Sequence, residues 1–356
     1  MRIEEIDRNF VTAKLGNVDY LFRDAGHQAF TLSGLAWFDQ EKKYCRLPQD
    51  ALSKQNEGVQ SLAWNTAGAQ LRFRTNSAKI ALRVKLLSAS NMSHMPASGQ
   101  SGFDLYLGVG KQKNYLKTAI PPINTDQYDT LIFDHQESID REFTLNFPLY
   151  NGIKSLEIGL LPEATISAPT PFSITAPVLF YGSSITQGGC ASRPGNCYCQ
   201  ILSRHLDFEC LNFGFSGSAR GETAMAELIA GLKLAAFVLD YDHNAQTLEY
   251  LQKTHAPFYQ RVRNHQPDLP IVLVSKPDVD LLPDDAALRR KIIKKTYDQA
   301  RASGDQNIFW VNGKKLFGKK DRDACTVDGC HPNDLGFCRM AEQIEPTLRK
   351  ALQLTR

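Results

Sequence analysis

Two short segments in the second half of the chain contain residue types that could form a nucleophilic catalytic site. The first is Gly182-Ser183-Ser184, which follows the apolar residues 177–181. A glycine at this place allows a sharp turn that presents a serine hydroxyl above a strand end. The second is Asp328-Gly329-Cys330-His331. An Asp three residues before a His can fix the imidazole tautomer, and the other ring nitrogen can then accept a proton from a serine.

These two segments together resemble the SGNH (GDSL-type) hydrolase superfamily. Its first block is usually Gly-Asp-Ser, with the third residue as the nucleophile. The resemblance therefore implies that Ser184 is the nucleophile, while Ser183 stands where Asp is common. It also implies that His331 is the general base and that Asp328 orients it.

Two further segments match the superfamily's blocks for an oxyanion hole. Gly217 ends the segment 212–217 (NFGFSG), where the family uses a glycine backbone N–H. Asn244 ends the segment 240–244 (DYDHN) and matches the family's Asn donor, although the usual GxND spelling is absent. With the backbone N–H of Ser184, these groups are expected to bind the oxyanion formed during ester hydrolysis. The implied reaction requires no metal and no cofactor.

Arg193 and His243 are candidate substrate-binding residues. Arg193, in the loop 191–196, could hold a polar substrate, and a solvated loop charge is an equally consistent interpretation. His243 precedes Asn244 and either lines the pocket or is an ordinary loop residue. The other histidines are interpreted as surface or packed residues: His27, His94, His135, His205, His255 and His265.

The candidate residues fall within a pattern of alternating strands and helices that begins near residue 177. Strands are expected at 177–181, 209–214, 236–240, 270–275 and 308–311, and helices near 196–206, 221–233, 247–264, 285–303 and 334–353. This alternation predicts a parallel sheet with helices on both faces. Five strands favour a three-layer flavodoxin-like domain, whose ligands bind beyond the carboxyl ends of the strands. The candidate catalytic residues all follow such ends.

The chain before about residue 165 is expected to be all-β, as a β-sandwich or jelly roll. Expected strands are 59–64, 69–75, 79–86, 103–107 and 154–160. The segment 102–106 (GFDLY) resembles the GxDLY motif of a sandwich domain that precedes one group of SGNH hydrolases. Its Asp104 is expected to be a turn or interdomain partner and not a catalyst. A linker at 167–171 predicts domains at 1–168 and 175–356.

Composition and charge limit the classes of partner. The chain has 356 residues and a formal net charge of +3, with basic and acidic residues interspersed, so no nucleic-acid or membrane partner is expected. No apolar run approaches the ~18 residues of a membrane span. The charged start, without a signal-peptide core, predicts a cytoplasmic protein unless a leader was removed. Its eight cysteines are then expected to be reduced. A Cys325–Cys330 disulfide, or a redox-sensitive thiol beside the site, is the alternative.

The combination of a sandwich with an SGNH domain commonly removes acyl groups from carbohydrates. By this resemblance, we expect a serine esterase that hydrolyses short-chain esters of a sugar or oligosaccharide. Acetyl is the acyl group that we expect. Two alternatives stay open. One is a lipase, lysophospholipase or thioesterase of the same superfamily. The other is a carbohydrate-binding protein with a decayed hydrolase domain, against which the presence of Ser184, Asp328 and His331 argues. The sequence does not specify the acyl group, the alcohol, the role of the sandwich or the oligomeric state.

Overall fold

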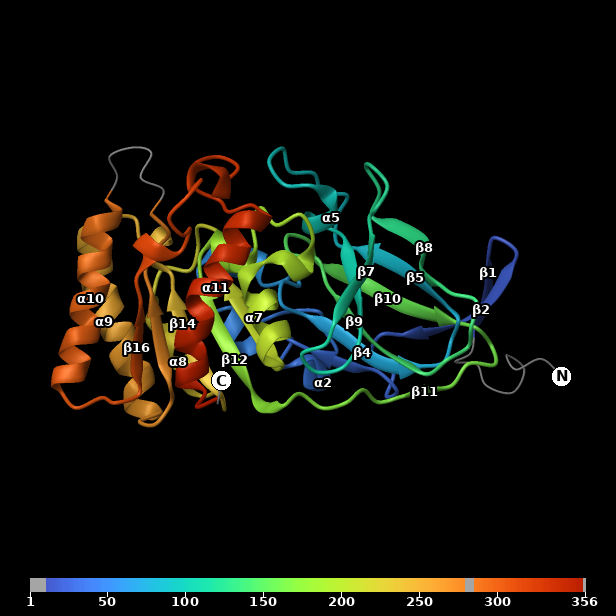
Figure 1. The fold of residues 1–356 in the computed structure, drawn as a ribbon, viewed down its shortest axis with the longest axis horizontal. Helices are drawn as coiled ribbons and strands as arrows, with labels where there is room; N and C mark the ends of the chain where they lie inside the picture. Colours follow the sequence, from blue (N-terminus) through green and yellow to red (C-terminus); the bar gives the residue numbers. More distant parts are fainter. Residues whose placement is uncertain (1–10, 279–284, 355–356) are drawn as a thin grey trace.

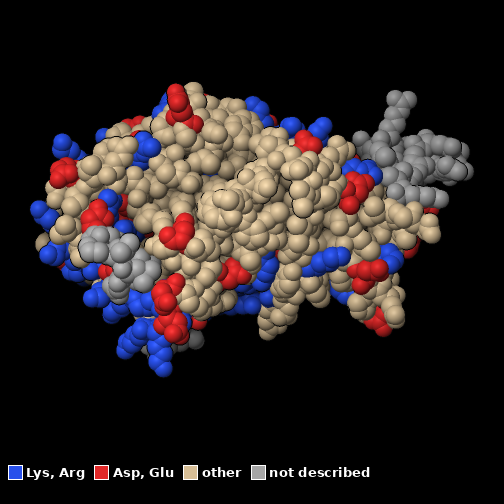
Figure 2. All heavy atoms as spheres, turned by 90° about the horizontal axis from the view of Figure 1, so that it is seen from above, with Lys and Arg blue, Asp and Glu red and all other residues tan. Residues whose placement is uncertain are grey.

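The computed structural model describes residues 11–278 and 285–354, and it has a β-rich part followed by an α/β part (Figure 1). On the face displayed in Figure 2, basic and acidic side chains are interspersed mainly around the margins, and much of the middle carries neither. Within the described residues, no helix combines the length and the apolar character needed to cross a bilayer.

The β-rich part consists of two sheets of antiparallel strands. Their strands are β1 (Val11–Leu15), β2 (Val18–Asp24), β3 (Thr31–Ser33), β4 (Gln70–Thr75), β5 (Lys79–Leu86), β6 (Phe103–Leu107), β7 (Asn114–Ala119), β8 (Gln127–Asp134), β9 (Arg141–Asn146), β10 (Ile153–Leu160) and β11 (Ile166–Ser167). One sheet has the order β1-β2-β10-β5-β8, and the other has β11-β4-β9-β6-β7, with β3 paired to β4.

A shared hydrophobic core lies between these sheets. Successive inward positions of β5, such as Ile80, Leu82 and Val84, are buried in it together with Phe73 of β4 and Phe143 of β9. This period of two is what a strand with one buried face requires. Four of the five expected strands are confirmed, because β4, β5, β6 and β10 occupy their places.

The fifth expected strand, 59–64, is wrong. This segment forms the helix α4 (Glu57–Leu62), which Asn56 caps by accepting a hydrogen bond from the Val59 N–H at 3.0 Å. Val59 and Ala63, four residues apart, share one helix face and are buried in a core of the α/β part. Tertiary packing and the cap therefore override the strand-like run of residue types. The short helices α2 (Phe38–Glu41), α3 (Gln49–Leu52) and α5 (Ala97–Gln100) also belong to this half.

The α/β part contains a parallel sheet of five strands in the order β13-β12-β14-β15-β16. The strands are β12 (Ile174–Gly182), β13 (Phe208–Gly214), β14 (Ala236–Asp240), β15 (Ile271–Val274) and β16 (Ile308–Val311). The main helices are α7 (Tyr198–Leu206), α8 (Thr223–Ala230), α9 (Leu248–His265), α10 (Ala286–Ala302) and α11 (Asp334–Ala351). The predicted alternation, the five strands and the flavodoxin-like order are confirmed.

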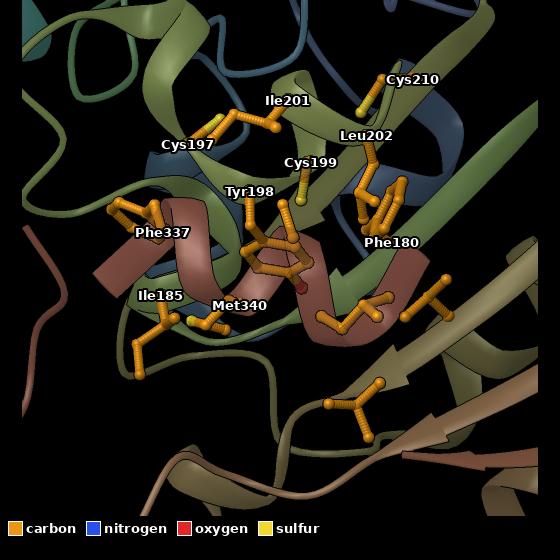
Figure 3. Packing of buried hydrophobic residues seen from close by; sticks show 14 of the residues in the cluster. Phe180, Ile185, Cys197, Tyr198, Cys199, Ile201, Leu202, Cys210, Phe337 and Met340 are labelled. Carbon is orange, nitrogen blue, oxygen red and sulfur yellow. The ribbon is translucent and has the colours of Figure 1, made fainter. Parts of the chain in front are cut away.

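Helices cover both faces of this sheet. On one face, Phe180 of β12 packs against Tyr198 of α7, and Tyr198 in turn stacks on Phe337 of α11 (Figure 3). On the other face, the neighbouring Tyr181 stacks on Phe258 of α9, with ring centroids 5.0 Å apart. Because alternate residues of β12 are buried on opposite sides, its continuous apolar run is the one expected for a central parallel strand.

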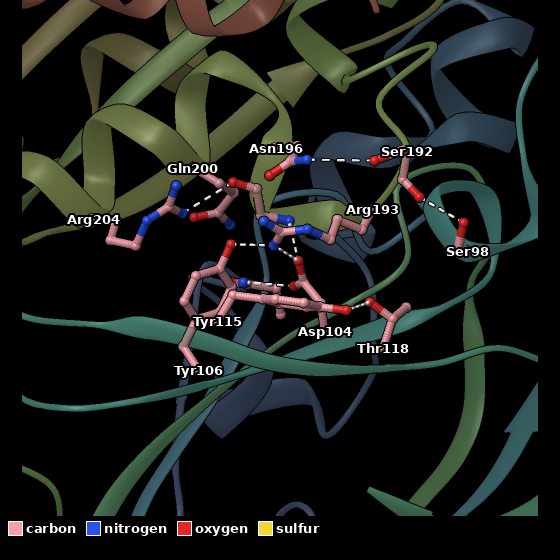
Figure 4. Close-up of polar contacts among 12 residues, drawn as sticks. Ser98, Asp104, Tyr106, Tyr115, Thr118, Ser192, Arg193, Asn196, Gln200 and Arg204 are labelled. Atoms are coloured by element: carbon pink, nitrogen blue, oxygen red, sulfur yellow. Dashed lines mark hydrogen bonds and ion pairs between the residues drawn. The ribbon is translucent and has the colours of Figure 1, made fainter. Parts of the chain in front are cut away.

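Buried polar contacts join the two parts. Asp104 of β6 is fully buried and accepts hydrogen bonds from Arg193 at 2.8 Å, from the Gly195 N–H at 2.9 Å and from Asn146 at 2.8 Å (Figure 4). Arg193 also lies over the Tyr115 ring, 3.9 Å from its centroid. Asp104 is thus an interdomain partner, as expected. The division into domains at 1–168 and 175–356 stays a prediction.

Candidate active site

Ser184 stands at a tight turn between strand and helix. It begins the short helix α6 (Ser184–Gln187), directly after β12. A Cβ at Gly182 would lie 2.0 Å from Oγ1 of Thr186, so this turn requires glycine. Ser183 caps the helix, because its hydroxyl accepts a hydrogen bond from the Ile185 N–H at 3.2 Å. Ser and Asp are both good N-cap residues, which explains why Ser183 can stand where the superfamily usually has Asp.

Asp328 and His331 share one loop, which the bridge between Thr326 and Pro332 closes. One carboxylate oxygen of Asp328 accepts the backbone N–H of Cys330 at 2.9 Å and that of His331 at 2.7 Å. The other oxygen lies 2.7 Å from Nδ1 of His331. Burial alone would raise the pKa of Asp328, but the hydrogen bonds from His331 and Cys330 lower it below its usual value. The carboxylate is therefore charged and fixed against the imidazole.

The tertiary structure brings this loop to Ser184. Nε2 of His331 lies 3.0 Å from Oγ of Ser184, and together with the Asp328 contact this makes a continuous Ser–His–Asp chain. Ser184 is buried, whereas the side chains of His331 and Asp328 are 23% and 38% exposed. The geometry suits transfer of the serine proton to the imidazole.

The pKa of His331 is raised to about 9. The largest cause is a hydrogen bond with Cys330; burial opposes the rise, and Asp328 adds to it. Cys330 in turn lies 2.9 Å, through Sγ, from Nε2 of His243. The structure thus places His243 beside the catalytic loop, where its polar contact is a thiol.

The candidate oxyanion donors lie around Ser184. Within the described residues, the backbone N–H groups of Ser184 and Gly217 have no hydrogen-bond partner. Gly217 has a φ of +64°, and a Cβ there would meet nothing within 4 Å, so its backbone borders open space. Asn244 donates one amide hydrogen to the Phe215 carbonyl at 2.9 Å, which ties it to the loop that carries Gly217. Its second amide hydrogen is available to a ligand.

The structure places Arg193 between the two halves of the chain, and its expected role in substrate binding stays a prediction. Its guanidinium pairs with the buried Asp104 and with the Tyr106 hydroxyl. A cation held between a buried carboxylate and aromatic rings is committed to joining the two halves of the chain. The loop position of Arg193 gave no sign of these partners, because they lie on a strand of the sandwich.

The sandwich half contributes two residues to the site that sequence reasoning missed. The Tyr150 hydroxyl donates to the Ser184 carbonyl at 3.0 Å, and so holds the start of α6. His94 was interpreted as an ordinary surface or packed residue, and it is exposed. Its ring nevertheless lies 5.7 Å from that of His331, centroid to centroid. No local pattern in the sequence marks either residue, because both approach the site from another part of the fold.

All eight cysteines lie within the described residues, and each is a free thiol. The alternative of a Cys325–Cys330 disulfide is therefore wrong for this structure. Cys325 is buried, whereas Cys330 is partly exposed beside the triad.

Among the described residues, Asp328, Cys330 and His331 form a group whose ligand atoms lie close enough to hold a metal ion. Both ring nitrogens of His331 already contact Asp328 and Ser184.

The flavodoxin-like sheet and the residues at its strand ends can be compared with known proteins. Residues 20–166 match the model of the GxDLY N-terminal domain of SGNH-hydrolase-type esterases. Residues 175–349 match the model of the GDSL-like lipase/acylhydrolase family. The chain belongs to this GDSL-like lipase/acylhydrolase family and carries its GxDLY N-terminal domain.

Solved structures support the same assignment. A protein from Bacteroides ovatus ATCC 8483, described as a GDSL-like lipase, is 28% identical with a TM-score of 0.85, over 94% of this chain and 99% of that one. A salicylyl-acyltransferase from a tetracycline biosynthetic pathway is 20% identical with a TM-score of 0.77, over 93% and 97% of the two chains. A family two carbohydrate esterase from Cellvibrio japonicus is 13% identical with a TM-score of 0.62, over 94% and 98%. No curated protein sequence matches this chain.

Proposed function

We propose that this GDSL-like hydrolase is a serine esterase that removes short acyl groups from hydroxyls of a sugar or oligosaccharide, with acetyl as the preferred group. The observation that carries the proposal is the continuous chain from Oγ of Ser184 through His331 to Asp328, with contacts of 3.0 and 2.7 Å. A nucleophile, a base and an orienting carboxylate within hydrogen-bond reach are the parts that acyl transfer through serine needs.

The proposed reaction has two halves. In the first, Oγ of Ser184 attacks the ester carbonyl carbon while Nε2 of His331 takes the hydroxyl proton, and the alcohol then leaves with that proton. In the second, water gives a proton to the same nitrogen, attacks the acyl-serine and releases the acid. Asp328 stays ionised and stabilises the imidazolium at each stage.

Three hydrogen-bond donors would stabilise the negative charge that develops on the carbonyl oxygen: the N–H groups of Ser184 and Gly217 and the amide of Asn244. In well-studied enzymes the loss of one such donor costs about 3–4 kcal/mol of transition-state stabilisation. The free N–H groups and the open space next to Gly217 support this assignment. Asn244 also holds the Phe215 carbonyl, so the same side chain would position the loop that supplies the second donor.

The carbohydrate alcohol is supported by the architecture and by the surface near the site. The family two carbohydrate esterase shares the fold over nearly the whole of both chains. Among the described residues, the exposed large apolar side chains nearest to Asp328 and His331 in the sequence are Val327 and Leu335, whereas Val109, Leu116, Ile120 and Ile123 belong to the sandwich half. A lipase would need a broader apolar surface beside its nucleophile.

The test is a series of p-nitrophenyl esters, from acetate to octanoate, followed by acetylated xylo-oligosaccharides with acetate release as the readout. We expect the highest kcat/KM for acetate and release of acetate from the oligosaccharide. Ser184→Ala is the matched control, because it removes the attacking oxygen and little else. Activity that rises toward octanoate would favour the lipase alternative. Absence of turnover on every ester would favour the decayed, carbohydrate-binding alternative. Formation of an acylated second alcohol in place of free acid would indicate an acyltransferase.

A further inference from the structure

The thiol of Cys330 and the imidazole of His243 lie together beside the proposed triad. Cys330 stands within the catalytic loop, and its Sγ lies 2.9 Å from Nε2 of His243. His243 comes from a different element, the short helix η2 (Asp242–Asn244). The buried guanidinium of Arg289 fixes that helix by donating to the Ala245 carbonyl at 2.8 Å. The pairing of Cys330 with His243 is therefore built by the fold and not by a mobile side chain.

The thiol of Cys330 is the side-chain hydrogen-bond partner of His243. Within the described residues, Nδ1 of His243 is buried without a hydrogen-bond partner, so Cys330 is the polar contact of this ring. Burial alone would raise the pKa of Cys330, but hydrogen bonds from His243 and His331 lower it to about 6. A cysteine next to an imidazole commonly exists as a thiolate–imidazolium pair, which is the nucleophilic form of sulfur.

Among the residues that the structure describes, four other titratable groups face Cys330, and none of them is a second thiolate at neutral pH. They are Asp328 and His331 from its own loop, Cys190 from the loop after α6, and Tyr150 from the sandwich half. Burial raises the pKa of Cys190 to about 11, with Asp328 and Cys330 adding to the rise. Burial likewise raises the pKa of Tyr150. Cys190 and Tyr150 therefore stay protonated at neutral pH.

The chain contains a natural control thiol. Cys338 is exposed, but burial of part of its thiol and the nearby Glu342 raise its pKa. The six remaining cysteines are buried: Cys45, Cys190, Cys197, Cys199, Cys210 and Cys325. Cys330 therefore combines access to solvent with an imidazole partner, whereas Cys338 has access without that partner.

We propose that Cys330 is a covalent modification site, at which hydroperoxides and other soft electrophiles add to sulfur and stop hydrolysis at Ser184. In the peroxide reaction the thiolate attacks one peroxide oxygen, so that an S–O bond forms and the O–O bond breaks. The departing oxygen takes a proton equivalent to the one that the thiol gave up, by way of the adjacent His243 ring or of solvent, and leaves as water or an alcohol. Sulfur is oxidised by two electrons to a sulfenic acid, the peroxide is reduced by the same two electrons, and an added thiol reverses the change.

The effect on hydrolysis rests on the proposed function, because it acts through His331. Cys330 directly precedes His331 and makes the largest contribution to the raised pKa of that imidazole. An oxygen added to Sγ occupies space next to the ring that accepts the proton of Ser184, and this is the expected cause of the loss of hydrolysis. The modification itself needs Cys330 and its imidazole neighbours, and it does not need Ser184.

The first experiment measures alkylation of each cysteine by iodoacetamide in the full folded chain, by peptide mass spectrometry at pH 7. We expect Cys330 to react at least about 10-fold faster than Cys338, because only the thiolate is nucleophilic. His243→Ala should slow the alkylation of Cys330 and leave that of Cys338 unchanged, because the largest cause that lowers the Cys330 pKa is gone while His331 remains. His243→Asn is the second variant if the first does not fold. Ser184→Ala should label as the wild type does. Equal rates for Cys330 and Cys338, or no effect of the His243 variants, would overturn the proposal.

The second experiment treats the enzyme with hydrogen peroxide, removes the excess and measures ester hydrolysis before and after dithiothreitol. The wild type and Cys338→Ser should lose most activity and regain it on reduction. Cys330→Ser should keep the activity that it had before treatment, whatever that level is. Inactivation of Cys330→Ser to the same degree as the wild type would refute the proposal. Fast labelling of Cys330 in a chain that hydrolyses no ester would support the modification site and refute the esterase function.

Discussion

Two carboxylate–cation pairs of this protein have nearly equal contact distances but differ in how far they are exposed to solvent. Asp104 pairs with Arg193 at 2.8 Å, and Asp328 pairs with His331 at 2.7 Å. The Asp104 side chain is 0% exposed and accepts three hydrogen bonds, whereas Asp328 is 38% exposed and its imidazole partner keeps a second nitrogen for Ser184. A pair whose carboxylate is fully enclosed and fully hydrogen-bonded holds the structure together. A partly open pair with a free nitrogen can also move a proton.

The largest expected effect tests whether the open pair acts as one unit with Ser184. Ser184→Ala and His331→Ala should each reduce kcat by about 10⁵–10⁶-fold, and the double variant should be little worse, because members of one catalytic unit are not additive. Steady-state kinetics with p-nitrophenyl acetate measures this, and circular dichroism checks the fold. Additive losses in the double variant would show that the two residues act independently.

Asp328→Asn should leave the fold intact and reduce kcat/KM by about 10⁴-fold, because the amide allows the wrong imidazole tautomer. The melting temperature should change little, since the side chain is 38% exposed. Activity near that of the wild type would mean that another group orients His331.

Asp104→Ala tests the closed pair and should show the opposite pattern. Removal of one partner leaves Arg193 and the Asn146 amide without their acceptor, so we expect a loss of about 3–5 kcal/mol in unfolding free energy. Urea denaturation measures this loss. Asp140→Ala is the matched control, because it breaks the exposed pair with Arg74 and should cost only a small fraction of that amount. The remaining folded Asp104→Ala enzyme should keep the wild-type pH profile. A changed profile would place Asp104 within the catalytic machinery.

The smallest expected effect is a shift of the pH profile. His331 must be neutral to accept the serine proton, so kcat/KM should fall as the pH drops through the His331 pKa, which is raised to about 9. Cys330→Ala removes the largest cause of that rise, and the acid limb should then move to lower pH. Measurement of kcat/KM from pH 5 to 10 for both enzymes decides this, with Cys338→Ala as the control. An unmoved limb would show that Cys330 does not control the protonation of His331.

Local sequence determined much of this protein. The alternating apolar segments of the second half fix the parallel sheet, because each strand must bury both faces. Gly182 fixes the turn before Ser184, since a Cβ there has no room. The three-residue spacing of Asp328 and His331 fixes their contact, because both belong to one short loop.

What the sequence left open depends on groups that are distant along the chain. Residues 59–62 belong to a helix and not to a strand, because Asn56 caps that helix and the α/β core covers Val59. Arg193 contacts Asp104, and His243 contacts Cys330, because the fold brings together residues that are 89 and 87 positions apart. The spacing of residues along the chain does not predict such contacts. Only the packing of the sandwich and the sheet decided which of these polar groups became structural and which stayed available for chemistry.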